Sequence, residues 1–162
     1  MNNVMIDLET MGSSSNAAVI AIGAVFFDPV TGDLGAEFYQ TIELSSAAKF
    51  GDMDTSTIEW WFKQSEAAKE VFNDAHKLIL EYALAEFTDW LAQIDGFRER
   101  IVWGNGASFD CVILRNAYKA IGVTCPWPFY GERDVRTVVD IGRQVKNIDR
   151  DWETIRSLNP SI

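Results

Sequence analysis

The chain begins with the stretch Val4-Met5-Ile6-Asp7-Leu8-Glu9-Thr10, a short apolar run that ends in two acids. The apolar part is typical of a buried β-strand. Side chains of a strand alternate between its two faces, so Asp7 and Glu9 point the same way and lie roughly 6.6 Å apart along the backbone. Like charges this close raise each other's pKa unless a cation lies between them. The pair therefore predicts a divalent-metal site at the end of a strand.

The length and composition predict a single domain with enough apolar residues for a core and an excess of acidic side chains. The chain has 162 residues, 48% of them hydrophobic, with ten Phe and six Trp to fill a core. Its 14 basic and 24 acidic residues give a net charge of −10. This balance argues against broad, non-specific adhesion to long duplex nucleic acid, which depends on Lys and Arg. It does not exclude nucleic acid as a substrate, because bound cations can supply local positive charge.

The cysteines and the apolar runs predict a cytoplasmic protein that has no association with a membrane. Cys111 and Cys125 have neither CxxC nor zinc-site spacing, so both are expected to be reduced thiols. The N-terminal residues lack the basic segment of a signal peptide. The longest apolar run, residues 17–27, is too short to span a bilayer.

The order of apolar patterns predicts a mixed sheet with helices packed on it. Strands are expected at residues 4–9, 18–28, 37–44, 100–104 and 129–133. The first three have short connections, which indicates an antiparallel meander. Helices are expected at residues 56–64, 66–74, 77–94, 109–121 and 135–145, the first capped by Asp54 or Thr55. In the third helix, apolar residues recur at spacings of 4, 3 and 4, a strongly amphipathic pattern.

A further acid, Asp110, follows the fourth predicted strand. The intervening Gly104-Asn105-Gly106 allows a sharp turn and lacks the third glycine of a dinucleotide-binding motif. In the first turn of a helix, an isolated Asp is explained by the helix dipole alone. Beside Asp7 and Glu9 it has a second explanation, because adjacent strand ends would bring three carboxylates to one metal cluster. Mg²⁺ and Mn²⁺ favour such oxygen ligands.

These motifs together resemble a known family. Asp7-Leu8-Glu9-Thr10 resembles the first motif of the DEDD (DnaQ-like) 3′–5′ exonucleases, Asn105 to Asp110 resembles the second, and residues 134–137 resemble the stretch that follows on the fifth strand. Residues 57–65 resemble a small bacterial and phage exoribonuclease branch near RNase T and oligoribonuclease. The resemblance covers about residues 4–145. It implies an RNase H-like fold, with three antiparallel strands, then two parallel strands, and helices on both faces.

The resemblance also implies a two-metal mechanism with Mg²⁺ or Mn²⁺. Asp7 would bridge both ions, Glu9 would complete the first site, and Asp110 would support the second. The implied substrates are the 3′ ends of single-stranded RNA or DNA, the product is a nucleoside monophosphate, and a homodimer is plausible. The candidate substrate-binding residues are Thr10, Met11, Trp61, Asn105 and Phe109.

One expected motif has no counterpart. Members of the family carry HxxxxD or YxxxD beyond the stretch at residues 134–137, and the sequence ends at Ile162. The single histidine, His76, precedes the second motif. Asp140, Asp149 and Asp151 lack a His or Tyr at the required spacing before them. The general base and the fourth carboxylate are therefore unidentified, and the hypothesis is a single exonuclease domain, residues 1–162, without the C-terminal helix that carries the last motif.

Three aromatic residues and one arginine allow two interpretations each. Adjacent Trp60 and Trp61 diverge by about 100° around a helix, so one belongs to the core and the other is free to stack on a base. We expect Trp61 to be the stacking residue. Phe109 is a second stacking candidate, although core packing is the favoured explanation for it. Arg136 belongs either to a solvated face or to a phosphate contact.

Three functions remain in competition. The first is a metal-dependent 3′–5′ exonuclease acting on short or single-stranded RNA, with DNA as the less favoured substrate. The second is a phosphatase with a strand-end Asp nucleophile, but such chemistry requires Asp where this chain has Glu9. The third is a catalytically impaired nuclease-fold module that binds nucleic acid or a protein partner.

Overall fold

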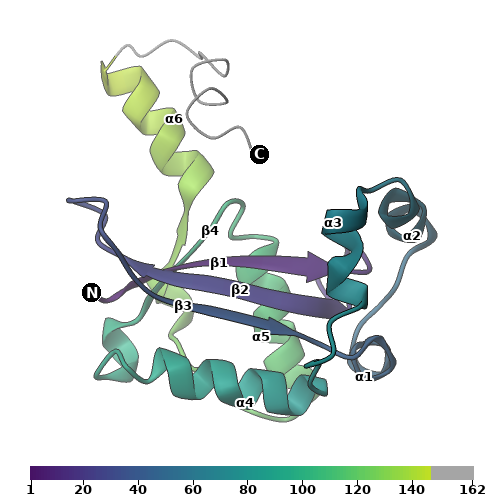
Figure 1. The fold of residues 1–162 in the computed structure, drawn as a ribbon. Coiled ribbons are helices and arrows are strands. Elements are labelled where there is room, and N and C mark those ends of the chain that lie inside the picture. Colours follow the sequence, from purple (N-terminus) through teal and green to yellow (C-terminus); the bar gives the residue numbers. More distant parts are fainter. Residues whose placement is uncertain (147–162) are drawn as a thin grey trace.

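The computed structural model describes residues 1–146, which form a mixed sheet with strand order β3-β2-β1-β4-β5 (Figure 1). The strands are β1 (Asn3–Thr10), β2 (Val19–Phe27), β3 (Leu34–Thr41), β4 (Ile101–Gly104) and β5 (Glu132–Asp134). The α-helices are α1 (Leu44–Phe50), α2 (Thr55–Phe62), α3 (Glu66–Lys69), α4 (Leu80–Leu91), α5 (Asp110–Ala120) and α6 (Val135–Lys146). Short 3₁₀ turns are η1 (Glu70–Phe72), η2 (Phe97–Glu99) and η3 (Phe129–Gly131).

Strand directions confirm the predicted RNase H-like α/β arrangement. β1 pairs antiparallel with β2, and β2 pairs antiparallel with β3. On its other edge β1 pairs parallel with β4, which pairs parallel with β5. β1 is therefore the central strand, with a neighbour on each side.

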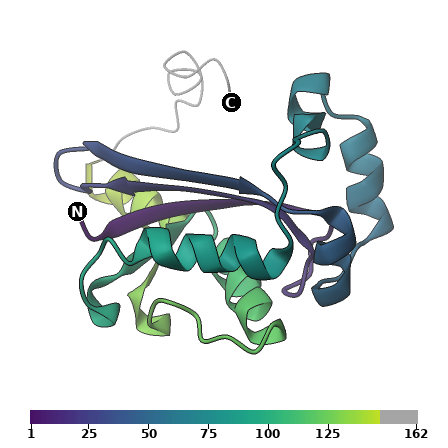
Figure 2. The same ribbon diagram turned by 60° about the horizontal axis from the view of Figure 1, so that its bottom comes forward.

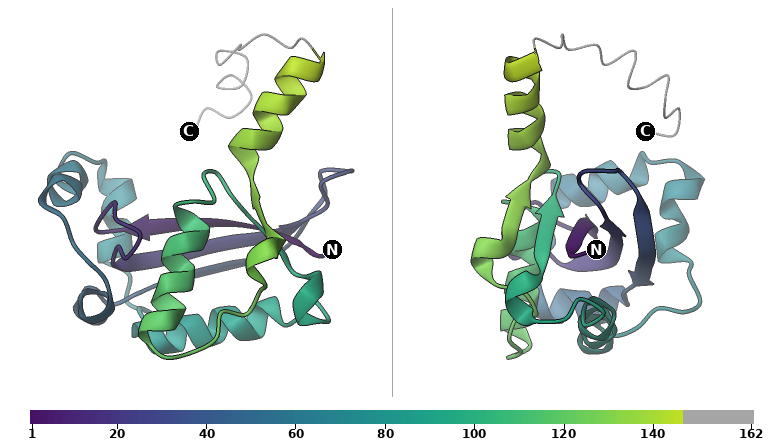
Figure 3. Two further views of the ribbon diagram at one scale, coloured as in Figure 1. Left: turned by 180° about the vertical axis from the view of Figure 1, so that it is seen from behind. Right: turned by 90° about the vertical axis from the view of Figure 1, so that its left-hand side faces the viewer.

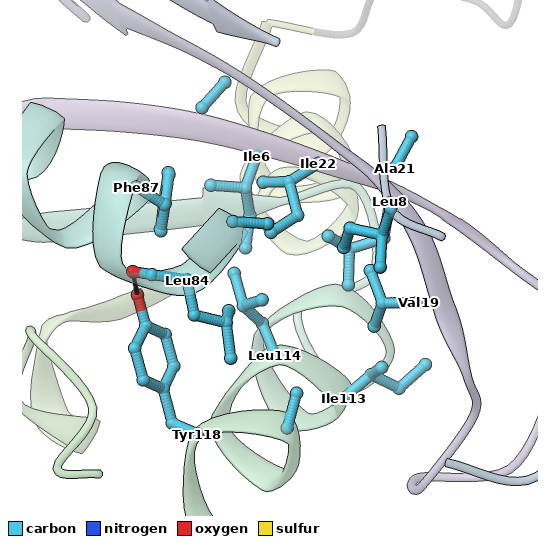
Figure 4. Close-up of a cluster of buried hydrophobic side chains, with 14 of the residues drawn as sticks. Ile6, Leu8, Val19, Ala21, Ile22, Leu84, Phe87, Ile113, Leu114 and Tyr118 are labelled. Atoms are coloured by element: carbon cyan, nitrogen blue, oxygen red, sulfur yellow. Dashed lines mark hydrogen bonds between the residues drawn. The ribbon is translucent and has the colours of Figure 1, made fainter. Parts of the chain in front are cut away.

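The core lies between the sheet and helices α4 and α5, which cover one face (Figure 2). Val4, Ile6 and Leu8 of β1 are buried on this face. Figure 4 shows Ile6 and Leu8 together with side chains of α4 and α5. Because side chains alternate along a strand, Asp7 and Glu9 point to the opposite face. There, α3 and η1 cover the ends of β1 to β3, so helices lie on both faces.

Several element boundaries differ from the prediction. The third strand lies at residues 34–41 rather than 37–44, and the unpredicted helix α1 follows it. The helix expected from Lys77 begins at Leu80, because Leu78 pairs with the end of β3: its amide donates to Thr41 O at 3.1 Å. The fifth strand is confined to residues 132–134, after η3. Helix α2 has Asp54 as its N-cap, as one of the two predicted alternatives.

The last described helix, α6, extends away from the sheet (Figure 3). Asp149, Asp151 and the end of the chain, on which the expected C-terminal motif depends, lie outside the described residues. No helix within residues 1–146 has both the length and the apolarity needed to cross a membrane.

Candidate active site

Strand β1 presents Asp7 and Glu9 to an open groove of about 630 Å³. Their cross-strand partners on β2 are Gly23, which has no side chain, and Ala21, which has only a methyl group, so no bulky side chain rises from the floor of the groove. Residues of β3, α3 and η1 form the sides of the groove. The strand alternation that buries Leu8 thus turns both acids, Asp7 exposed and Glu9 half-buried, toward a hollow that a substrate can enter.

Asp110 joins these acids from the first residue of α5. Strand β4 ends at Gly104, opposite Ile6, so β1 continues past its parallel neighbour. There the Leu8 amide donates to Asp110 Oδ1 at 3.2 Å, and Asp110 is only 5% exposed. A Cβ on Gly104 would lie 3.2 Å from Asp110 Oδ2, so a glycine at this position lets the carboxylate approach β1 closely. Asp110 therefore lies beside the segment of β1 that carries Asp7 and Glu9.

The three carboxylates are coupled electrostatically through Asp7. Burial raises the pKa of Asp7, and burial together with the charge of Asp7 raises the pKa of Glu9. Burial is also the main cause that raises the pKa of Asp110 to about 6, and the charge of Asp7 adds to it. The Leu8 amide and the Arg136 guanidinium act in the opposite direction on the pKa of Asp110. A divalent cation would relieve this mutual repulsion.

The donor chemistry suits a hard metal ion, although the carboxylates do not already enclose one. Within residues 1–146, no three His, Cys, Asp or Glu side chains form a ready-made metal cage. Asp7, Glu9 and Asp110 nevertheless supply the oxygen ligands that Mg²⁺ and Mn²⁺ prefer.

The two tryptophans of α2 are arranged opposite to the expectation. Trp61 is 5% exposed, and its indole Nε1 donates to Thr10 O at 2.9 Å. Trp60 is 51% exposed. The expectation that Trp61 is the exposed, freely stacking member is therefore wrong, because α2 packs its Trp61 side against Phe72, with ring centroids 5.0 Å apart.

The other candidate substrate-binding residues fall into two places. Met11 and Trp61 line a second pocket of about 340 Å³, and Thr10 is joined to it through the indole hydrogen bond. Apart from Lys69, its lining residues are apolar: Met11, Leu44, Met53, Ile58, Trp61, Phe62 and Phe72. Asn105 and Phe109 lie instead in the turn that leads to Asp110, where Asn105 is exposed and Phe109 is 36% exposed.

The groove also contains residues that the sequence analysis did not select. Tyr39 and Thr41 of β3 line it, as does Asp74. Thr41 Oγ1 donates to Asp74 Oδ2 at 2.6 Å and the His76 amide donates to Asp74 Oδ1 at 2.8 Å, which lowers the pKa of Asp74. Burial and the charges of Glu9 and Asp74 raise the pKa of Tyr39. Odd-numbered residues of this strand face away from the core, a signal that the sequence contained.

The strand order, the paired acids on the central strand and the acid that opens α5 define a DnaQ-like 3′–5′ exonuclease domain, as the motifs indicated. A family model described as the 3′–5′ exoribonuclease Rv2179c-like domain matches residues 2–157. A protein of Enterobacteria phage T4 named exodeoxyribonuclease is 31% identical over 165 residues, covering 86% of this chain and 71% of the phage protein. The chain belongs to the Rv2179c-like family of DnaQ-like exonucleases.

Solved structures share the fold at low identity. Cell-death related nuclease 4 (CRN-4) matches with a TM-score of 0.61 at 11% identity, over 91% of this chain and 49% of that one. Exonuclease I of E. coli, in complex with a dT13 oligonucleotide, matches with a TM-score of 0.61 at 14% identity, over 93% of this chain and 30% of that one. The nuclease domain of 3′hExo, a DEDDh family member bound to rAMP, matches with a TM-score of 0.55 at 12% identity, over 91% of this chain and 72% of that one. The chain thus spans about half of CRN-4 and under a third of exonuclease I.

Proposed function

We propose that this protein is a metal-dependent exonuclease that removes nucleoside monophosphates from the 3′ ends of short or single-stranded RNA. The observation that carries the proposal is the set of three carboxylates at one end of β1. Asp7 couples to both Glu9 and Asp110, and Asp7 and Glu9 open onto the groove. Family membership supports the reaction class.

Asp7, Glu9 and Asp110 would hold Mg²⁺ or Mn²⁺. In a two-ion site, the bound ions supply an activated water and stabilise the leaving 3′ oxygen of an in-line displacement. The chain's own part is to hold the ligands in place. The Leu8 amide fixes one oxygen of Asp110, β2 pairs with β1 along the acids, and β4 pairs with residues 3–6 just before them.

The remaining candidate residues would position the substrate. The low floor formed by Ala21 and Gly23 leaves space for a sugar–phosphate chain beside Asp7 and Glu9. The pocket lined by Met11 and Trp61 would take a base by apolar contact, which tolerates any base. Phe109 and Asn105 would contact the nucleic-acid strand on the side of the groove where Asp110 lies.

RNA is proposed as the preferred substrate because the family is described as an exoribonuclease domain. The phage relative is named an exodeoxyribonuclease, so DNA is the alternative to measure. RNA and DNA oligonucleotides of one sequence, compared side by side, test this part of the proposal. Faster shortening of the DNA strand would reverse the preference.

The decisive experiment follows 5′-labelled single-stranded RNA over time, with Mn²⁺, with Mg²⁺ and with EDTA. We expect a ladder that shortens from the 3′ end with either metal and no change in EDTA. Asp7→Asn should abolish shortening, whereas Glu86→Gln, at an exposed acid of α4 on the other side of the sheet, should not. Internal cleavage, or full activity in Asp7→Asn, would contradict the proposal. Binding without shortening would identify an impaired nuclease-fold module instead.

A further inference from the structure

A single carboxylate, Asp134, joins the turn before α5 to the start of α6. Asp134 Oδ2 accepts a hydrogen bond from the Ala107 amide at 2.8 Å. Its other oxygen, Oδ1, accepts from the Arg136 amide, also at 2.8 Å. The backbone of Arg136 is therefore fixed relative to the turn that carries Asp110.

The side chain of Arg136 lies against this same turn. Gly106 has a φ of +110°, and a Cβ built on it would lie 3.0 Å from Arg136 Nη1 and 3.2 Å from Arg136 Cζ. A side chain at this position would force the guanidinium to shift by a few tenths of an ångström, and the positive φ also favours glycine. The Arg136 side chain thus packs directly against the backbone of Gly106.

The charge of Arg136 reaches one carboxylate of the candidate active site. It acts on Asp110, whose pKa it lowers. Arg136 is exposed, and within residues 1–146 the ion pairs are Lys69–Glu66 and Arg115–Glu132, so no described carboxylate pairs with its guanidinium. An exposed guanidinium that forms no ion pair with any described carboxylate is placed beside the site, in a chain whose net charge is −10.

We propose that Arg136 binds a phosphate of the nucleotide held at the acid end of β1. A guanidinium presents parallel N–H donors that match the non-bridging oxygens of a phosphate, and its charge does not depend on pH. Asp134 fixes the backbone of Arg136, and Gly106 leaves room for its guanidinium beside the turn, so the side chain is already close to the site before the ligand arrives. The inference rests on the proposed function for the location of the nucleotide.

Comparison of adenosine 5′-monophosphate with adenosine isolates the phosphate contact. Calorimetry in buffer containing Mg²⁺ would measure both affinities for the wild type and for Arg136→Gln. We expect Arg136→Gln to weaken binding of the monophosphate by about 10-fold or more and to leave adenosine unchanged. Arg136→Lys keeps the positive charge but lacks the two parallel N–H donors of a guanidinium, so it should bind the monophosphate more tightly than Arg136→Gln and less tightly than the wild type.

Arg133→Gln is the matched control, since this exposed arginine of β5 donates from Nη1 to the carbonyls of Tyr130 and Glu132. It should leave both affinities unchanged, and unfolding midpoints should show that all three variants fold. Equal affinities of wild type and Arg136→Gln for the monophosphate, or equal losses for monophosphate and adenosine, would overturn the inference.

The oligonucleotide assay separates this inference from the proposed function. If the wild type shortens RNA but Arg136→Gln still prefers the monophosphate as strongly as the wild type does, only the inference fails. If the wild type does not shorten RNA but Arg136 governs the preference for the monophosphate, only the exonuclease proposal fails.

Discussion

Replacing Asp110 by Asn should stabilise the metal-free protein while removing a proposed metal ligand. Asp110 is 5% exposed, and its ionised form is disfavoured by burial and by the charge of Asp7. Asn is close to Asp in shape, and its side-chain oxygen can still accept the hydrogen bond from the Leu8 amide, which is 3.2 Å from Asp110 Oδ1. The substitution therefore removes the unfavourable charge and leaves the packing in place.

The magnitude follows from the pKa, which rises from 3.8 to about 6 on folding. Between these values the folded state binds more protons than the unfolded state, so the stability of the wild type falls as pH rises from about 4 to about 6. The loss at neutral pH amounts to about 3 kcal/mol. Asp110→Asn should recover most of it, an increase of about 1.5 M in the urea midpoint for a chain of this size.

Urea unfolding in EDTA, followed by tryptophan fluorescence, measures this difference. The advantage of Asp110→Asn should be largest at neutral pH and should shrink toward a pH of about 4, where Asp110 is protonated in the folded wild type. Added Mn²⁺ should narrow the difference at neutral pH, because the ion stabilises the wild type more. A variant that is less stable than the wild type at neutral pH would refute the reasoning, as would an advantage that does not change with pH.

Three further results are expected. Trp61→Ala should reduce the free energy of unfolding by about 3 to 5 kcal/mol and Trp60→Ala by about 0.5 kcal/mol or less, because only Trp61 is buried; similar urea midpoints would disprove this. Tyr118→Phe should lose about 1 to 2 kcal/mol, since its hydroxyl donates to Leu84 O at 2.9 Å (Figure 4); an unchanged midpoint would show that the hydroxyl contributes nothing. Mn²⁺ should raise the melting temperature of the wild type by binding the folded state, and Asp7→Asn should show a clearly smaller rise; equal rises would place the ion elsewhere.

The central strand and its acids could be predicted from the sequence because their signals are local. The alternation of Ile6, Asp7, Leu8 and Glu9 needs only the two-residue period of a strand. The position of Asp110 needs only a turn and a helix start. What the sequence could not supply was how Asp110 reaches β1, because that depends on β4 ending opposite Ile6.

The features that the sequence analysis missed or placed wrongly are determined by contacts between residues far apart in the sequence. Helix α1 has seven residues and no side-chain cap at Glu43, so its local signal is weak. The helix is stabilised instead by contacts with distant residues, such as the hydrogen bond that the Leu80 amide donates to Ser46 Oγ at 2.9 Å. The periodicity of α2 showed that Trp60 and Trp61 face different ways. Which one is buried was decided by the carbonyl of Thr10, 51 residues earlier.

The central place of β1 has a consequence for local opening of the molecule. Amide protons of a strand with a partner on both edges exchange with solvent only when much of the protein opens, whereas those of α6, which extends from the sheet, exchange through fraying. Asp7 and Glu9 thus directly follow residues 3–6, which pair with both β2 and β4 and are the part of β1 expected to have the slowest deuterium uptake. Mild warming or low denaturant would loosen the periphery while the two acids keep their spacing.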